Sequence, residues 1–124
     1  HVIEPLIGYM LLAEKNFENL CPINNFAAAY NFGPNLSSNR SVKELVEECH
    51  KHWQGRWKDI SSESAPHEAN RLNLQIDKAY HDLNWVPIWD FEVTCCRTIN
   101  WYKACHSGLS ALEACNADLD FYFS

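Results

Sequence analysis

Apolar residues recur at the three- and four-residue spacing typical of α-helices in several stretches of the chain. The first stretch runs from Pro5 through Lys15, and a proline suits the first turn of a helix. The expected buried face of this helix consists of Leu6, Tyr9, Met10, Leu12 and Ala13.

Two serine–glutamate pairs mark where further helices begin. In each pair the serine oxygen can accept the third helical N–H while the glutamate reaches back to the serine backbone. Ser41 and Glu44 form the first such capping box, and Ser110 and Glu113 form the second, before a tail helix. The first helix then places apolar residues at helical spacing, at Val42, Leu45, Val46, Cys49 and Trp53, and Gly55 is expected to end it.

A short helix is expected over Asp77–Leu83, closed by Asn84, Trp85 and Pro87. Asp90 is a plausible cap for a long helix that runs through Cys105 and stops at Gly108, with Phe91, Cys95, Ile99 and Tyr102 on one side.

Short strands are expected between these helices. Ala27–Phe32 reads as a buried strand that stops at the turn Gly33-Pro34-Asn35. Trp57–Ile60 and the alternating positions around Leu72 and Leu74 suggest two more. The fold class predicted is therefore α+β and mainly helical, in one domain over residues 1–124.

Composition and charge narrow the function classes. The 124 residues, 47% hydrophobic and 21% charged, suit one soluble globular domain. No apolar run is long enough to span a membrane, and no secretory signal opens the chain. A net charge of −6 with scattered basic residues argues against nucleic-acid binding. The start at His1, inside an apolar run, suggests a piece of a larger protein.

Six cysteines are many for this length, but none forms a Cys-x-x-Cys pair. Most are expected to be reduced thiols that fill core space, which places the protein in the cytoplasm. A zinc site at Cys49, His50 and His52 lacks paired ligand spacing, and no thiol stands out as a protease nucleophile. No metal is expected.

A series of short motifs follows in a recognisable order. His1-Val2-Ile3-Glu4-Pro5-Leu6 is followed by Tyr30-Asn31-Phe32-Gly33-Pro34-Asn35, Pro66-His67-Glu68-Ala69, Leu83-Asn84-Trp85-Val86-Pro87 and Thr98-Ile99-Asn100-Trp101-Tyr102-Lys103. Together they resemble the C-terminal portion of extended short-chain dehydrogenase/reductases. The first and third motifs resemble the CDP-glucose 4,6-dehydratase branch.

The resemblance implies a substrate-binding lobe that closes over a nucleotide sugar, beside a Rossmann domain that holds NAD. Such enzymes are NAD-dependent lyases that remove water from the sugar by way of hydride transfer. This chain has no glycine-rich loop for NAD and no Tyr-x-x-x-Lys pair. No catalytic or cofactor-binding residue is therefore assigned, and the chain is expected to be inactive without the missing Rossmann domain.

Four residues are the candidate substrate-binding groups. The resemblance implies that Asn31 donates to the substrate's diphosphate and that His67 and Glu68 contact the diphosphate and base. Arg71 stands where the branch usually has an aromatic residue, and its guanidinium could grip a phosphate with two N–H groups. For Asn31 the alternative is a bond to its own loop backbone, and for His67 and Glu68 a solvated loop.

Two other functions stay open. The chain could be the lobe of a related sugar-nucleotide epimerase or of a different dehydratase, or a non-catalytic binding module derived from such a lobe. In each case the expected partners are a nucleotide sugar and the missing Rossmann domain. Self-association through exposed apolar residues of the first helix is also expected.

Overall fold

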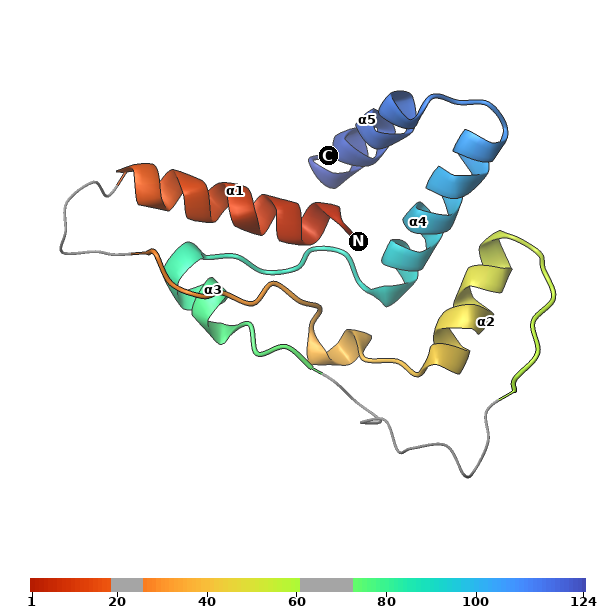
Figure 1. The fold of residues 1–124 in the computed structure, drawn as a ribbon, viewed down its shortest axis with the longest axis horizontal. Helices are drawn as coiled ribbons and strands as arrows, with labels where there is room; N and C mark the ends of the chain where they lie inside the picture. The colour runs from red at the N-terminus through yellow and green to blue at the C-terminus, as the bar shows by residue number, and fades with distance from the viewer. Residues whose placement is uncertain (19–25, 61–72) are drawn as a thin grey trace. The chain divides into compact units, whose positions relative to one another are not determined.

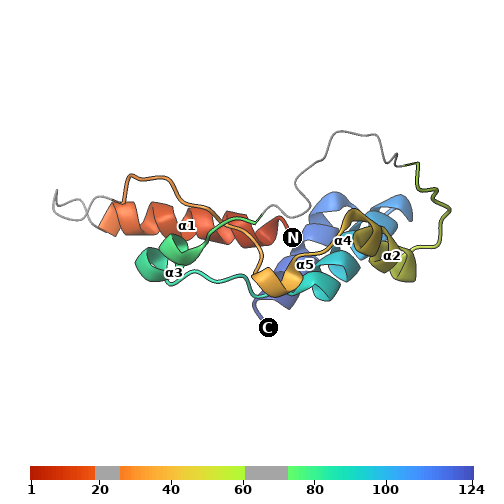
Figure 2. The same ribbon diagram turned by 90° about the horizontal axis from the view of Figure 1, so that it is seen from below.

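The computed structural model describes residues 1–18, 26–60 and 73–124. These residues fall into two compact units, and the chain passes between them more than once. Unit 1 comprises His1–Ser38 and Asn73–Asp90, and unit 2 comprises Asn39–Leu72 and Phe91–Ser124. Figures 1 and 2 show the helices of both units, coloured along the chain. None of the described helices is long and apolar enough to cross a membrane.

Unit 1 is built on two helices, α1 (Ile3–Glu18) and α3 (Asp77–Leu83), which contact one another. A short 3-10 helix, η1 (Leu36–Ser38), ends its first segment. Ala79, Leu83 and Trp85 form the buried core, and Trp85 is only 2% exposed. Ile7, Leu11, Leu12, Phe26, Tyr30, Phe32 and Ile76 pack around this core.

The ring of Phe32 fills the space beside α1. It meets the ring of Trp85 edge to face, with 5.0 Å between centroids, and the ring of Tyr9 in the same way at 5.4 Å. A Cβ atom on Gly8 would lie 2.3 Å from a carbon of the Phe32 ring. Only glycine therefore lets this ring come so close to the helix.

The buried face expected for α1 is wrong. Leu6, Tyr9 and Met10 are 48%, 57% and 67% exposed, and Ala13 is exposed too. Of the five expected residues, Leu12 alone packs against the core. The other side chains of α1 that do so are Ile7 and Leu11, and Ile3 is buried. Both sides of this helix are apolar, so its own pattern cannot say which side the remaining elements of unit 1 will cover.

Unit 2 consists of α2 (Val42–His52), α4 (Phe91–His106) and α5 (Ala111–Tyr122). The middle helix, α4, contacts both α2 and α5 (Figure 1). Both predicted capping boxes are confirmed, because Ser41 and Ser110 each accept the N–H of the glutamate three residues on. Gly108, with a φ of 99°, provides the turn between α4 and α5.

Charged groups join the helices of unit 2. Arg97 of α4 binds the carboxylate of Asp118 and the backbone oxygen of Ala117, both on α5. Lys103 of α4 donates to the backbone oxygen of His52 at the end of α2, at 2.9 Å. Within α2, the buried Glu48 accepts from Lys51 one turn later.

The short strands expected from the sequence, and with them the α+β class, are wrong. Residues 27–32, 57–60 and 73–74 are not strands, and the described residues form helices and irregular segments with no sheet. Leu72, which belonged to the third expected strand, lies outside the described residues. Residues 26–32 run beside helices, whose backbone groups already bond within each helix, so a β-ladder cannot form there. They contribute side chains to the core instead.

Candidate functional site

Asn31 is the one candidate substrate-binding residue that the structure describes. It lies on the irregular segment after residue 26 and is exposed. Its side-chain nitrogen donates to the backbone oxygen of Gln75 at 3.3 Å. Asn31 therefore links two segments far apart in the sequence. The bond uses one of its two amide hydrogens, and the side-chain oxygen is an acceptor.

The neighbouring Tyr30 belongs to a charged cluster with α3. Its hydroxyl donates to the carboxylate of Asp82 at 2.9 Å, and the ammonium of Lys78 binds that carboxylate too. The Lys78 nitrogen also lies 3.8 Å from the centroid of the Tyr30 ring. Bonding to Lys78, and then to Tyr30, holds the pKa of Asp82 below its ordinary value, and bonding to Asp82 raises the pKa of Lys78.

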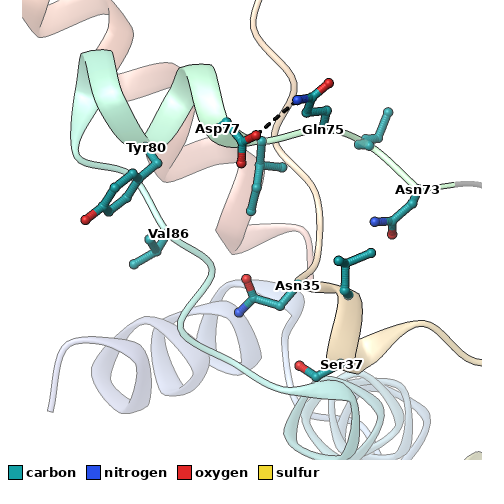
Figure 3. Close-up of a pocket in the computed structure, with 10 residues that line it drawn as sticks. Asn35, Ser37, Asn73, Gln75, Asp77, Tyr80 and Val86 are labelled. Carbon is teal, nitrogen blue, oxygen red and sulfur yellow. Dashed lines mark hydrogen bonds between the residues drawn. The ribbon is translucent and has the colours of Figure 1, made fainter.

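An open cavity of about 700 Å³ lies in unit 1 (Figure 3). Residues of the segment 35–37, of the segment 73–77, and Tyr80 and Val86 line it. Its polar groups are Asn35, Ser37, Asn73, Gln75 and Asp77. The side chain of Gln75 donates to the carboxylate of Asp77 at 3.0 Å, as the dashed line in Figure 3 marks.

Of the four predicted substrate-binding residues, the structure describes one. Asn31 contacts Gln75, which lines the cavity, whereas His67, Glu68 and Arg71 lie outside the described residues. The cavity residues themselves were not predicted from the sequence. One signal for them was present, because Asn35 ends the motif that also contains Asn31. Asn73, Gln75 and Asp77 carry no motif of their own and become neighbours of Asn35 only through folding.

The thiols and acidic side chains show no metal-binding arrangement in the part of the chain that the structure describes. No three His, Cys, Asp or Glu side chains there gather closely enough to hold an ion. Cys49, Cys95, Cys96, Cys105 and Cys115 are free thiols. Burial, with Cys49 beside it, raises the pKa of the Cys95 thiol to about 11, so this sulfur stays protonated at neutral pH.

Comparison with known proteins adds one relative. The chain is 31% identical, over 126 aligned residues, to a CDP-glucose 4,6-dehydratase from Salmonella typhimurium. The alignment covers the whole chain but only 34% of that protein, in its C-terminal part. No model of a known protein family matches the chain. The resemblance found in the ordered motifs is thereby confirmed.

Proposed function

Because this chain is related over its whole length to the C-terminal part of a CDP-glucose 4,6-dehydratase, we propose that it is the substrate-binding part of such an enzyme. The full-length match carries this proposal. One contact supports it further: the indole nitrogen of Trp85 donates to the backbone oxygen of Glu4 at 3.1 Å. The motifs His1–Leu6 and Leu83–Pro87, which are far apart in the sequence, thus pack together.

The proposed substrate is a nucleotide sugar of the CDP-glucose type, which would lose water to give a 4-keto-6-deoxy sugar. Its proposed binding residues are Asn31, His67, Glu68 and Arg71. Asn31 supports this role by its exposure and by the bond that orients its amide. Binding side chains held by a neighbouring segment lose less conformational entropy when the ligand arrives.

The hydride chemistry requires NAD, which this chain has no loop to hold. Its four glycines stand alone, so no glycine-rich turn can approach a pyrophosphate. We therefore propose that an NAD-binding domain covers the apolar side of α1 that unit 1 leaves exposed. Leu6, Tyr9 and Met10 of α1 and Val2, which precedes it, are each at least 48% exposed and form this outer face of α1.

A chimeric enzyme tests the proposal. Residues 1–124 would replace the matching C-terminal part of the Salmonella dehydratase, and formation of a 4-keto-6-deoxy sugar from CDP-glucose would be measured. We expect activity in the chimera and none in the chain alone, which should also show no saturable NAD binding. A chimera that folds and binds NAD but converts no nucleotide sugar would contradict the proposal.

Matched asparagine variants show whether the proposed site is used. Asn31→Ala in the chimera should raise the KM for CDP-glucose by about tenfold, as expected when a hydrogen bond to a charged group is lost. Asn100→Ala, on the exposed surface of α4, is the control and should leave KM unchanged. Equal KM values for the two variants would show that Asn31 does not bind the substrate.

A further inference from the structure

The cavity beside Asn35 combines polar edges with apolar walls. Leu36, Leu74, Ile76 and Val86 supply apolar surface, and Tyr80 adds an aromatic ring that is 49% exposed. Amide and hydroxyl groups of Asn35, Ser37, Asn73 and Gln75 supply both donors and acceptors. Its volume of about 700 Å³ falls within the usual range for small-molecule sites, roughly 300–1,000 Å³.

The charge of the described lining residues disfavours the diphosphate of a nucleotide sugar in this cavity. Among the described residues that line it there is no Lys, Arg or His, and the one charged side chain is the carboxylate of Asp77. Lys78 follows Asp77 in the chain, but its ammonium is bound to Asp82 and lies over the ring of Tyr30. A diphosphate in the cavity would meet Asp77 with no cation from these lining residues to offset the repulsion.

The arrangement of Gln75 and Asp77 favours a neutral ligand with a hydrogen-bond donor. Gln75 donates its amide to one oxygen of Asp77 (Figure 3), which leaves the carbonyl oxygen of Gln75 and the second carboxylate oxygen of Asp77 as acceptors. A hydroxyl or exocyclic amine could donate to this pair. Asn35, from the segment 35–37, and Asn73, two residues before Gln75, carry amide donors for acceptors elsewhere on the ligand.

We propose that this cavity binds an uncharged ring edged with donors and acceptors, and that Asp77 accepts a hydrogen bond from it. The ring is either the hexose or the base of the nucleotide sugar, and its face lies against the apolar wall. This inference rests on the proposed function for the identity of the whole ligand. It assigns Gln75, Asp77 and Tyr80 to recognition of the ring and leaves the diphosphate to residues outside the cavity.

Titration of the 124-residue chain with separate ligand parts tests the inference. Methyl glucoside, cytidine and inorganic pyrophosphate would be added in turn while the side-chain amide signals of Asn35 and Asn73 are followed by NMR. We expect saturable shifts with one of the two rings, which identifies the source, and none with pyrophosphate. Shifts of these signals with pyrophosphate, or with neither ring at millimolar concentration, would overturn the proposal.

Substitutions then separate recognition from folding. Asp77→Asn keeps the shape of the side chain but removes its charge, and we expect ring binding to weaken about tenfold. Asp120→Asn, an exposed change on α5, should leave ring binding unaltered. Unchanged binding in Asp77→Asn would contradict the proposal. Ring binding that persists while the chimera fails to react would leave the cavity assignment standing and overturn only the dehydratase function.

Discussion

The carboxylate of Glu4 accepts a hydrogen bond from the backbone N–H of Trp89, with 2.7 Å between oxygen and nitrogen. The same carboxylate oxygen accepts from the N–H of Ile88 at 3.0 Å. Glu4 is only 6% exposed, so a charged group in the first turn of α1 is taken out of water to hold the segment after Trp85. A buried carboxylate bonded to two backbone N–H groups is well satisfied.

Removal of this carboxylate should destabilise unit 1. Glu4→Ala would leave two backbone N–H groups without their acceptor, and we expect a loss of about 2–4 kcal/mol in the free energy of unfolding. Glu4→Gln, which keeps one acceptor oxygen, should lose less. Urea denaturation measures both, with the exposed Glu14→Ala on the same helix as control. Equal stability of the Glu4→Ala and Glu14→Ala variants would show that the bonds to Ile88 and Trp89 contribute nothing.

Gly8 should tolerate no side chain while Phe32 is present. Ordinarily alanine favours a helix over glycine, but here the added carbon would enter the Phe32 ring. We expect Gly8→Ala to cost about 1–3 kcal/mol, as overpacked cores do. Adding Phe32→Leu should recover part of that loss in a double-mutant cycle. A stabilised Gly8→Ala variant would mean that the Phe32 ring does not pack against Gly8.

The second capping box should make the stability of α5 depend on pH, with a loss of stability in acid. The hydroxyl and then the backbone N–H of Ser110 hold the pKa of Glu113 below its ordinary value. Its contribution is therefore complete above the pKa of an unfolded glutamate and is lost as the pH falls through the lowered value. The stability difference between the protein and Glu113→Gln should shrink in acid. A stability difference that stays constant as the pH falls would contradict this. Near neutral pH, Ser110→Ala should lower the free energy of unfolding by about 1 kcal/mol.

The outer face of α1 should cause self-association of the chain alone. Leu6 and Met10 are among the exposed apolar residues of this face, and we expect Leu6→Lys with Met10→Lys to shift the chain towards monomer. Leu112→Lys, at a residue 71% exposed on α5, is the matched control. Sedimentation at several concentrations measures the change. A monomeric unsubstituted chain, or an equal effect of the control, would refute a specific role for α1.

The cysteines should differ widely in reactivity. Cys115 is exposed, whereas Cys95 is buried and its raised pKa of about 11 leaves little thiolate at mildly alkaline pH. In the folded protein Cys115 should therefore be alkylated before Cys95, as followed by mass spectrometry of peptides. The order should vanish in denaturant. Early labelling of Cys95 in the folded chain would contradict its burial on α4.

Features that depend on a few neighbouring residues were predicted correctly from the sequence. Both capping boxes form because the serine and the glutamate lie within one turn of each other. The short helix Asp77–Leu83 ends where Asn84 adopts a left-handed conformation, with a φ of 54°. The relationship to the dehydratase was also readable in the motifs, since it resides in the order of residues along the chain.

Only the tertiary structure decided which apolar faces are covered. The side of α1 that contains Leu6 and Met10 is as apolar as the side that contains Ile7 and Leu11, so periodicity alone could not choose between them. The choice follows from Phe32 and Trp85, which are distant in sequence and pack on one side. The expected strand at residues 27–32 failed for the same reason: a β-propensity needs a neighbouring strand, and unit 1 provides helices.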